Sequence, residues 1–534
     1  MCGIFLFLDK EKTFSSENVF SNFLLVKHRG PDNSDFKIIK DLYVGFHRLS
    51  ITDTSSNSNQ PFVIQEENSN FLLICNGEIY NYTELIEEYS LELKKPYSDC
   101  LVLLHLYLKF DIKNFTDILE SKVKGEFAFI ICEIDKSGNI IKIISGRDTL
   151  GVRPLYTTRS FKGMCSEIKG IHFINEKIIE HPCGNVVVNN ISKEEILFYD
   201  YKKIYLTKSL DLNPFDYFYF IKNSLVESVK IRLSADRPIG FLLSGGLDSS
   251  LICGIASKLL GKIRTFSIGM ENSTDLIYAQ KVADFIGSDH TVIKFNKGDV
   301  LNCIEEVIKT VETYDITSIR ASIPQYLISK WISENTDIKV LLVGECSDEV
   351  TSGYLFNHFV PENKIQEICE KYTKELHIFD IKRCDRCISR FGMEARLPFS
   401  DSDFIKNYWK IPQELRHPKC NYLERCIEKK FLREAFRESG ILPEDVLYRR
   451  KEAFSDGVSG TSNSLHSFIK NHFDTNFPYI KGINDSPTIE STYYKFVFDK
   501  FFYGRSDILP HYWQPSYISE ENEFIDPSAR ELKF

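Results

Sequence analysis

A chain of 534 residues is too long for one hydrophobic core, and its length predicts two to four domains. The apolar content of 43% and the charged content of 26% are ordinary for a soluble globular protein. The net charge of −9 argues against nucleic acid or an anionic membrane as the main partner. No apolar run approaches the roughly 20 residues that a membrane-spanning helix needs.

The chain opens with Met1-Cys2-Gly3 and an apolar run. A small residue at position 2 allows removal of the initiator methionine, so we expect the mature protein to begin with Cys2. Such a residue carries a thiol and an α-amine, and the amine, with a reference pKa of about 8, can act as the base for the thiol. Taken alone, the same residues also fit a chance cysteine beside an apolar strand.

Short strands separated by Gly, Asn, Asp and Ser turns are predicted for residues 1–200. One helix is predicted near residues 100–110. Because helical crossovers between most of the strands are absent, we expect antiparallel sheets that pack face to face in an α+β domain. The predicted strands are residues 3–8, 43–47, 71–76, 127–134, 140–145 and 185–190.

Charged and amide side chains recur at the ends of these strands. A thiolate that attacks a carboxamide needs an oxyanion hole, which an Asn side chain and a Gly N–H can supply. An amino-acid substrate also needs an Arg for its carboxylate and an acid for its ammonium. Arg48, Asn76, Gly77, Glu78 and Asp99 contain that set. Each alone also fits a turn or surface residue, but their joint presence favours a site.

Several motifs of this half resemble those of the class II, N-terminal-nucleophile glutamine amidotransferases. They are Cys2, H-R-G-P-D at 28–32, R-L-S-I-T-D at 48–53, N-G-E-I-Y-N at 76–81, S-D-C at 98–100, and residues 125–129 and 146–156. The resemblance implies an N-terminal-nucleophile hydrolase fold, with Cys2 as nucleophile and Asn76 with Gly77 as oxyanion hole. The glutamine-binding residues that it implies are Arg48, Leu49, Ser50, Ile51, Thr52, Asn76, Gly77, Glu78 and Asp99.

A second motif, S-G-G-L-D-S-S at 244–250, follows an apolar run at 238–243 and precedes an apolar helical run to residue 260. A strand, a glycine-rich turn and a helix N-terminus together form a cradle for anions. The Walker motif needs Gly-Lys-Ser/Thr, and this loop has no Lys, so the usual kinase and ATPase interpretation fails. The loop resembles the S-G-G-x-D-S loop of enzymes that split ATP between its α and β phosphates. The alternative is a serine- and glycine-rich turn that caps a helix.

Strands and helices alternate after this loop. We expect strands at 263–268, 291–295 and 339–343 and helices at 275–286, 299–314 and 322–335, hence a parallel sheet whose ligands bind at the carboxyl ends of the strands. The segment G-E-C-S-D-E at 344–349 would then face the 244–250 loop. Asp248 and Asp348 could share Mg²⁺ bound to pyrophosphate, although acids at a helix start also fit a simple cap.

Over essentially its whole length the chain resembles the family of glutamine-hydrolysing asparagine synthetases, and its tail is nearer to their eukaryotic form. The matching segments are residues 312–322, 394–399, 450–457, 511–513 and 526–530. The resemblance implies a second domain of the pyrophosphate-loop ATPase type, in which Glu345 and Lys451 act beside an acyl-adenylate and Lys451 counters phosphate charge. The ATP-binding residues that it implies are Leu243, Ser244, Gly245, Gly246, Asp248, Ser249, Ile268, Gly344 and Glu345.

The chain departs from the family pattern at four positions. Cys346 stands where the family has Gly, Ser352 where it has Gly or Gln, Phe359 near a family Lys, and Ser400 where it has Leu. A β-carbon and a thiol at Cys346 would alter rate or oxidation sensitivity near the phosphates. The missing Lys near Phe359 affects contacts to aspartate. None of these departures removes a named catalytic group.

We therefore expect a glutaminase domain at 2–200, a linker at 201–220 and a synthetase domain at 221–534. Cys2 would release ammonia from glutamine, ATP with Mg²⁺ would adenylate the side-chain carboxylate of aspartate, and ammonia carried internally would give asparagine and AMP. One alternative is a different acceptor acid, as in β-lactam-forming relatives, which lack the amino-terminal cysteine. The other is a sensor that binds glutamine or nucleotide without turnover.

The fourteen cysteines are scattered without a framework, as is typical of reduced thiols, and the start lacks the basic leader of a signal peptide. We therefore expect a cytoplasmic protein, with glutamine, aspartate and ATP as ligands, no nucleic acid or membrane partner, and a homodimer as its assembly. Cys384 and Cys387 form a lone C-x-x-C without a second pair at zinc spacing, which favours a structural role over a metal or redox role.

Overall fold

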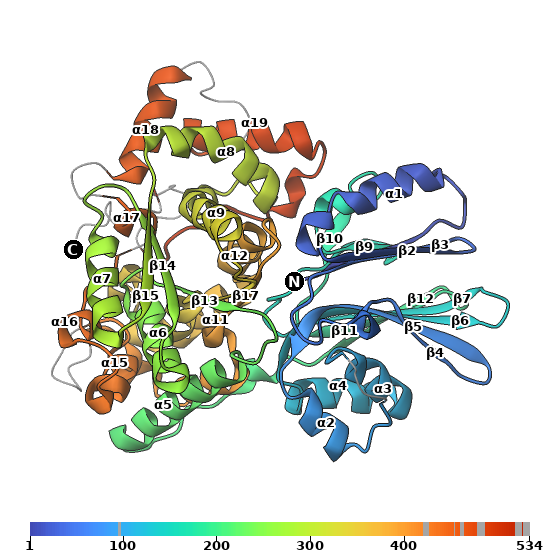
Figure 1. Ribbon diagram of the computed structural model, residues 1–534, viewed down its shortest axis with the longest axis horizontal. Helices are drawn as coiled ribbons and strands as arrows, with labels where there is room; N and C mark the ends of the chain where they lie inside the picture. The colour runs from blue at the N-terminus through green and yellow to red at the C-terminus, as the bar shows by residue number, and fades with distance from the viewer. Residues whose placement is uncertain are drawn as a thin grey trace. The chain divides into compact units, whose positions relative to one another are not determined.

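The computed structural model describes residues 1–93, 98–419, 427–452, 454–459, 464–477, 486–517 and 526. The chain divides into two compact units (Figure 1). The first comprises Met1–Lys203, Ser234–Arg237 and Ser389–Glu394, and the second Ile204–Leu233, Pro238–Ile388 and Ala395–Phe534. Of the motif residues, 453 and 527–530 lie outside the described residues.

The first unit is built on two six-stranded sheets, whose recorded strand pairs are all antiparallel, as predicted (Figure 1). The first sheet has the order β10-β8-β9-β1-β3-β2 and the second β12-β11-β7-β6-β5-β4. The bounds of the first sheet are β1 (Gly3–Leu8), β2 (Asn33–Ile39), β3 (Leu42–Arg48), β8 (Tyr156–Thr158), β9 (Gly163–Cys165) and β10 (Ile178–Glu180). Those of the second are β4 (Phe62–Gln65), β5 (Ser69–Ile79), β6 (Gly125–Asp135), β7 (Ile140–Arg147), β11 (Asn185–Asn190) and β12 (Glu195–Asp200).

The core of this unit follows from the alternation of side chains along each strand. Leu6 of β1 and Ile74 of β5 belong to one buried cluster shared by both sheets. Leu73, the neighbour of Ile74, faces the other way and packs with α2 (Tyr82–Glu88), α3 (Leu101–Lys109) and α4 (Ile112–Ser121). On the outer face of the first sheet, α1 (Ser16–Leu24) places the ring of Phe23 5.9 Å from that of Phe5.

Only α3 of these four helices was predicted. The other three have seven to ten residues and lack the continuous apolar run of α3, and such short helices depend on packing for stability.

The second unit is built on one five-stranded sheet of order β15-β14-β13-β16-β17 (Figure 1). The pairs β15–β14, β14–β13 and β13–β16 are parallel, which confirms the predicted α/β class. The strands are β13 (Ile239–Leu242), β14 (Arg264–Gly269), β15 (Asp289–Lys294), β16 (Val340–Leu342) and β17 (Glu394–Arg396). The helices are α5 (Pro214–Ile231), α6 (Leu247–Leu260), α7 (Thr274–Ile286), α8 (Lys297–Val311), α9 (Ile316–Asn335), α10 (Ser347–Thr351), α11 (Ile365–Glu375), α12 (Asp380–Ser389), α13 (Ser402–Trp409), α14 (Gln413–Arg416), α15 (Lys430–Phe436), α16 (Glu444–Leu447), α17 (Phe454–Gly457), α18 (Leu465–Asn476) and α19 (Ile489–Phe501).

Helix caps account for the differences between the predicted and observed bounds. α9 begins at Ile316 instead of 322, because the Asp315 side chain accepts the Ser318 N–H at 2.8 Å, and Pro324 lies inside the helix without ending it. α8 begins earlier than predicted through a capping box of Asn296 and Asp299. α5 begins at Pro214, within the range 201–220 that was expected to be a linker.

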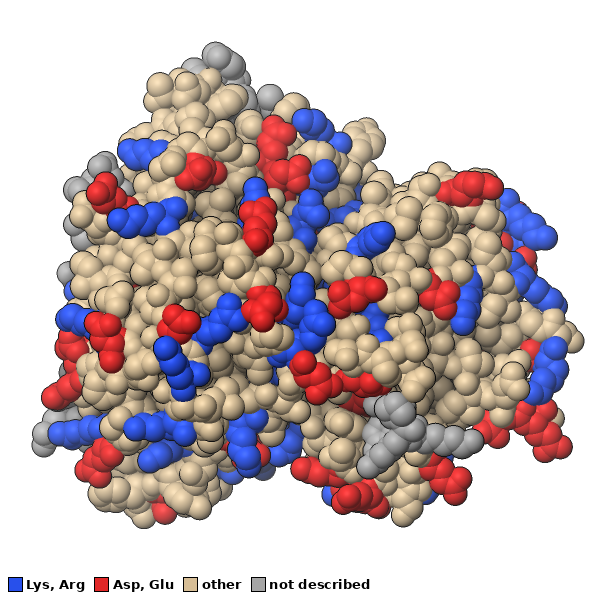
Figure 2. All heavy atoms as spheres, viewed as in Figure 1, with Lys and Arg blue, Asp and Glu red and all other residues tan. Residues whose placement is uncertain are grey.

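The surface and the cysteines give three further observations. Lysine and arginine are interspersed with aspartate and glutamate on the face drawn in Figure 2. In the described part of the chain, no helix has the length and apolarity that crossing a bilayer requires. The twelve described cysteines form no disulfide bond with one another, and Cys384 and Cys387 are buried on α12.

Candidate functional site

The first candidate site lies at the start of β1. The backbone N–H of Cys2 donates to Oδ1 of Asn76 at 2.7 Å, and its Sγ lies 3.8 Å from the carbonyl oxygen of Leu49. Asn76 is completely buried, and its Nδ2 has no hydrogen-bond partner among the described residues. A buried donor left unpaired costs about 1–3 kcal/mol. The arrangement therefore leaves a buried amide donor available for a ligand oxygen near the Cys2 thiol.

Gly77 follows Asn76 on β5 at a point of close approach between strands. A β-carbon at this position would lie 2.6 Å from the carbonyl oxygen of Glu126 and 2.7 Å from Cβ of Phe127. No side chain fits without displacing β6. This crowding explains the glycine of the N-G-E motif in packing terms, independently of any role for its N–H.

The Cys2 thiol is held in its protonated form. Burial raises its pKa to about 11, the amino-terminal charge lowers it, and the carboxylates of Glu394 and Glu78 raise it further. The ammonium of Met1, which is buried, lies 3.1 Å from Oε2 of Glu394. A thiol with this pKa needs a base in order to attack a substrate at neutral pH.

Arg48 keeps one edge of its guanidinium open. Its Nη1 donates to the carbonyl of Ser55 at 2.5 Å and to Oδ1 of Asn59 at 2.8 Å, and its Nη2 donates to the carbonyl of Asp53. These bonds use three of the five N–H donors. The Nε–H and the second Nη2–H, which form the edge that binds carboxylates in a bidentate manner, have no partner among the described residues.

The other predicted glutamine residues gather at the ends of β3 and β5. Thr52 donates its hydroxyl to Oε2 of Glu78 at 2.9 Å. Asp99 accepts the N–H of Ile79 at 2.7 Å, and its burial raises the pKa of its carboxyl although this bond and others lower it.

Two members of the R-L-S-I-T segment, Ser50 and Ile51, use their backbone groups in hydrogen bonds within the protein. The Ser50 N–H donates to Oδ2 of Asp32 at 2.8 Å, and the carbonyl of Ile51 accepts the N–H of Asp236 at 3.0 Å. The structure thus brings Cys2, Leu49 and Asn76 into contact, and separately Thr52 and Glu78.

Arg29 holds the backbone of Cys2 in place and was not assigned a role from the sequence. Its Nε donates to the carbonyl of Cys2 at 3.0 Å and its Nη1 to Oε1 of Glu167 at 2.8 Å, with no exposed surface. A β-carbon on the next residue, Gly30, would lie 2.2 Å from the carbonyl oxygen of His47. The H-R-G-P-D motif was the available signal, although nothing in it indicated a bond to Cys2.

The second candidate site is a cavity of about 240 Å³ at the carboxyl ends of β13, β14 and β16. Gly245 is absent from its lining. It has a φ of +73°, and a β-carbon there would lie 2.4 Å from the Ala279 nitrogen, so it serves the turn. The predicted nucleotide-binding residues that do line the cavity are Leu243, Ser244, Gly246, Asp248, Ser249, Ile268, Gly344 and Glu345.

The S-G-G-L-D-S-S loop organises its own hydroxyl groups and leaves backbone donors open. The hydroxyls of Ser244 and Ser249 lie 2.9 Å apart, and the N–H of Gly246 donates to the Ser244 hydroxyl at 3.3 Å. Gly246 caps α6 without a side-chain hydrogen bond. The first-turn N–H groups of α6 therefore remain available for an anion, as expected of a phosphate-binding loop.

Two lysines neutralise the carboxylates beside this loop. Nζ of Lys429 lies 2.7 Å from Oδ2 of Asp248 and 2.6 Å from Oδ1 of Asp348, and Nζ of Lys451 lies 2.6 Å from Oδ2 of Asp348. Burial alone would raise the pKa of Asp348, but the two ammonium groups hold it well below its usual range. Lys429 lies in the featureless run Glu428-Lys429-Lys430, and the sequence did not indicate it.

The two aspartates are suited to a shared magnesium ion. One ammonium contacts both carboxylates, so a single cation can reach both. The described residues contain no group of three or more metal-ligating side chains. Magnesium commonly takes one or two carboxylates and completes its shell with phosphate oxygens and water, which fits this donor set if Lys429 moves aside.

Glu345 lies against a guanidinium. Its Oε1 accepts from Nε2 of Gln325 at 2.9 Å and from Nη1 of Arg383 at 3.4 Å. Burial raises the pKa of this carboxyl, whereas the charge of Arg383 lowers it. Glu345 and Lys451 both line the cavity, as expected of residues that act on one intermediate.

The four departures from the family pattern have different surroundings. Cys346 lines the cavity, is 2% exposed and has a φ of +75°, the left-handed region that favours glycine. The hydroxyl of Ser352 lies 3.1 Å from Sγ of Cys369, and that of Ser400 donates to the carbonyl of Leu397 at 2.7 Å. Phe359 is 43% exposed.

Comparisons with known proteins show the family to which the chain belongs. The sequence pattern of the asparagine synthase family matches residues 221–364 and 358–507, and that of the glutamine amidotransferase domain matches residues 1–209. The glutamine-hydrolysing asparagine synthetase of Gallus gallus is 38% identical, with 100% of this chain and 99% of the relative covered. The probable glutamine-hydrolysing asparagine synthetase of Acanthamoeba polyphaga mimivirus is 37% identical, with 99% of each covered. The Homo sapiens enzyme is 36% identical, with 100% of this chain and 98% of the relative covered.

Proposed function

We propose that this chain, which belongs to the asparagine synthase family, makes asparagine from aspartate with ATP and with ammonia released from glutamine. ATP, aspartate, glutamine and water would give AMP, diphosphate, asparagine and glutamate. The observation that carries the proposal is that one chain holds both a partly buried thiol beside an unpaired amide donor and a glycine-rich loop that lines a cavity. Amide transfer by adenylation needs these two sites together.

At the first site, Cys2 would attack the side-chain amide of glutamine. Removal of Met1 would free the α-amine of Cys2, which would accept the thiol proton. Nδ2 of Asn76, with the N–H of Gly77, would donate to the oxygen that becomes negative as the carbon turns tetrahedral. Ammonia would leave with a proton, and water would hydrolyse the glutamyl thioester to glutamate.

The remaining residues of this site would hold glutamine in place. The open Nε–Nη2 edge of Arg48 suits the α-carboxylate of glutamine. Glu78 and Asp99 suit its ammonium, because both are buried carboxylates beside the same strand. Leu49, Ser50, Ile51 and Thr52 would shape the wall of the site through the backbone.

At the second site, the side-chain carboxylate of aspartate would attack the α-phosphorus of ATP, and pyrophosphate would leave. Adenylation is needed because a carboxylate oxygen is a poor leaving group whereas AMP is a good one. Lys451 would balance phosphate charge, and Glu345 would accept a proton from the attacking ammonia. Ammonia would attack the carbonyl carbon of the aspartyl-adenylate, giving asparagine and AMP.

Asp248 and Asp348 would hold magnesium together with pyrophosphate oxygens. Bound there, the ion would neutralise the charge of the departing pyrophosphate. The predicted domain bounds, the homodimer and the cytoplasmic location stay predictions. Sedimentation equilibrium tests the homodimer, and fractionation of cells tests the location.

Intact-mass measurement with an electrophilic glutamine analogue tests the first site. The purified protein should lack Met1 and gain one adduct, which should map to Cys2. An adduct on another cysteine, or none while asparagine is made from glutamine, would contradict the assignment.

Product analysis separates the proposal from its two rivals. With ATP, magnesium, aspartate and glutamine, pyrophosphate and asparagine should appear in equal amounts. A sensor would bind these ligands without releasing pyrophosphate. An enzyme for another acceptor acid would release pyrophosphate with that acid and not with aspartate.

A further inference from the structure

The strand that carries the oxyanion residues is covered by its edge neighbour along only part of its length. β4 pairs with β5 from Phe62, opposite Leu73, to Gln65, opposite Asn70. Cys75, Asn76 and Gly77 follow on β5 beyond the end of β4. Among the described strands, none pairs with this side of β5 past Leu73. The backbone groups that face this side therefore need other partners or a ligand.

The side chain of Gln60 takes the place of the missing strand. Its Oε1 accepts the N–H of Cys75 at 2.6 Å, and its Nε2 donates to the carbonyl of Cys75 at 3.1 Å. The register of β4, continued by two residues, would place residue 60 opposite Cys75, but Pro61 has no backbone N–H with which to continue the ladder. Gln60 is 5% exposed, so both bonds are shielded from water.

Gln60 thereby closes one of three successive positions on the open side of β5. In an antiparallel strand the N–H groups of every second residue face the same side, so those of Cys75, Gly77 and Ile79 face this side together. Gln60 accepts the first of them, and Oδ2 of Asp99 accepts the N–H of Ile79 at 2.7 Å. The Gly77 N–H lies between these two bonded positions, where a ligand oxygen can reach it.

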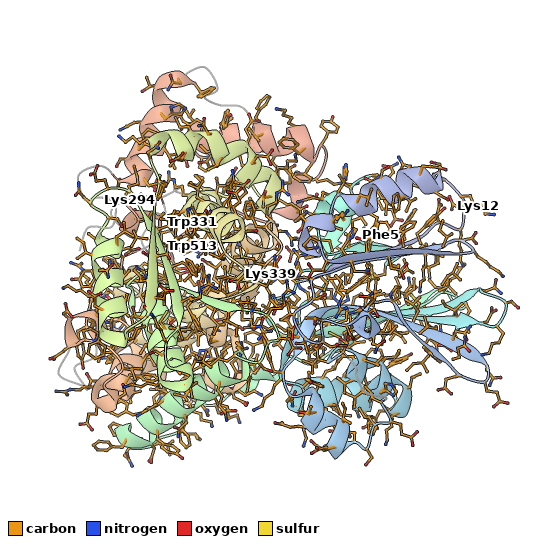
Figure 3. All side chains as sticks on the ribbon, in the orientation of Figure 1. Phe5, Lys12, Lys294, Trp331, Lys339 and Trp513 are labelled. Carbon is orange, nitrogen blue, oxygen red and sulfur yellow. The ribbon has the colours of Figure 1, made fainter. Side chains whose placement is uncertain are left out.

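The side-chain donor of the oxyanion hole is attached to the same backbone. Asn76 stands between Cys75 and Gly77, lies opposite Ala128 of β6, and accepts the N–H of Cys2. Cys2 directly precedes β1, on which Phe5 is labelled in Figure 3. A shift of the Cys75 backbone would therefore move Nδ2 of Asn76 and the N–H of Gly77 at once.

The residue before Gln60 holds a different part of the glutamine site. Oδ1 of Asn59 accepts from Nη1 of Arg48 at 2.8 Å, and the guanidinium of Arg48 is the proposed partner of the glutamine carboxylate. Two adjacent side chains thus hold two different groups, Asn59 a substrate-binding group and Gln60 the backbone of the oxyanion donors. Because binding and transition-state stabilisation affect different kinetic constants, the two roles can be separated by experiment.

We propose that Gln60 is a positioning residue for glutamine hydrolysis, whose amide fixes the backbone at Cys75 so that Nδ2 of Asn76 and the N–H of Gly77 meet the same oxygen. The inference rests on the proposed function and adds a residue that acts through the backbone of β5. Oxyanion donors must lie about 2.7–3.1 Å from the developing charge, so a small displacement of β5 would weaken both bonds.

Gln60→Met tests this role, because methionine has nearly the length and volume of glutamine but makes neither bond. We expect kcat for glutamine hydrolysis to fall about 10- to 100-fold and KM to change less than about threefold, since misplaced donors act on the transition state. Steady-state glutamate release gives both constants, and thermal melting shows that the variant is folded. An unchanged kcat in the folded variant would overturn the proposal.

Gln60→Asn serves if the methionine variant folds poorly. It keeps the amide on a side chain that is one methylene shorter, so it can reach the N–H or the carbonyl of Cys75 but not both. Its kcat should lie between those of the wild type and Gln60→Met. A kcat equal to that of the wild type would contradict the need for two bonds.

A double-mutant cycle with Asn76→Ala distinguishes positioning from a general loss of structure. If Gln60 acts through the oxyanion donors, Gln60→Met should lower kcat by a factor at least about threefold smaller in the Asn76→Ala protein than in the wild type, because one of the two donors is already absent. Equal factors in the two backgrounds would mean that Gln60 acts on the fold as a whole and would overturn the proposal.

Two further variants serve as comparisons. Gln65→Ala is the matched control, because Gln65 is an exposed glutamine at the end of β4, and both constants should stay unchanged. Asn59→Ala should raise KM about fivefold or more and leave kcat within about threefold, because it releases Arg48. A fall in kcat as large as that of Gln60→Met would assign the effect to the whole loop and not to the Gln60 amide.

The outcomes separate this proposal from the proposed function. If the wild-type protein hydrolyses glutamine and Gln60→Met keeps its kcat, the positioning role is wrong and the proposed function stands. If the wild-type protein releases no glutamate from glutamine, both are wrong. Ammonium-driven asparagine formation, which does not use the first site, should be unaffected in every variant.

Discussion

The bond from the backbone N–H of Cys2 to Oδ1 of Asn76, at 2.7 Å, identifies which end of the Asn76 amide is the donor. Because Oδ1 already accepts this N–H, Nδ2 must be the free end, and it is buried without a partner among the described residues. Cys2, the proposed nucleophile, and Asn76, the proposed oxyanion donor, are thus held together by one hydrogen bond. This relationship leads to the first two predictions.

Replacing Asn76 with alanine should remove oxyanion stabilisation. We expect kcat for glutamine hydrolysis to fall about 100- to 1000-fold with little change in KM, because the donor acts in the transition state. Synthesis from ammonium chloride should be unchanged. Steady-state glutamate release measures the effect, and Asn114→Ala, on the exposed start of α4, is the control. A higher KM with unchanged kcat would mean that Asn76 only binds the substrate.

Replacing Cys2 with alanine should separate the two half-reactions. Glutamine-driven asparagine formation should be lost, since no other group supplies the nucleophile, and ammonium-driven formation should keep the wild-type rate within about twofold. Asparagine is measured with each nitrogen source in turn. Equal loss with both sources would contradict a two-site enzyme.

Replacing Lys429 with alanine should make the stability of the second unit depend on magnesium. Without this ammonium, Asp248 loses its lysine partner and Asp348 keeps only Lys451, and breaking a buried ion pair costs about 3–5 kcal/mol. Millimolar magnesium chloride without ATP should therefore raise the melting temperature of the variant more than that of the wild type.

Lys281→Ala is the control for this experiment. Its ion pair with Asp445 has both side chains about half exposed, so its loss should cost less than about 1 kcal/mol and bring no response to magnesium. The same magnesium response in wild type and Lys429→Ala would show that Lys429 does not occupy the cation position.

Acid should lower the free energy of unfolding of the first unit, because two buried histidines bind protons only when the chain unfolds. Burial lowers the pKa of His47 to about 4, although its bond to Phe23 raises it, and burial with the charge of Arg147 lowers that of His181 to about 3. The unfolded chain binds protons near the reference value of about 6.5, while the folded chain does not. The stabilisation is therefore complete above about pH 6.5 and is lost as the pH falls toward 4.

The loss should be about 1.4 kcal/mol per pH unit for each histidine in that window. Urea unfolding of the protein at several pH values, followed by probes in the first unit, measures it. His181→Gln should bind about one proton fewer on unfolding than wild type at pH 5. An identical pH dependence in the two proteins would mean that His181 does not titrate on unfolding.

The more apolar β-strands of both units could be predicted because their apolar runs are local, whereas β2, β4, β8, β9, β10, β12 and β17 were not predicted. The strand at residues 3–8 was predicted with its observed bounds, and the absence of helical crossovers correctly indicated antiparallel sheets. The bounds of α8 and α9 were less accurate, because side-chain caps at Asn296 and Asp315 extended them beyond the apolar pattern. A cap is one hydrogen bond, and many Asn and Asp residues in the sequence do not form one.

By itself, the sequence determined the chemistry available to this protein. The thiol at Cys2, the amide at Asn76 and the S-G-G-L-D-S-S loop are contiguous motifs, so their residue types and spacing could be read directly. Only the tertiary structure decided which charges meet. Lys429 reaches Asp248 across 181 residues, and Lys451 reaches Asp348 across 103. Such pairings depend on long-range packing, because a side chain's partner is set by where the backbone brings it and not by its neighbours in the chain.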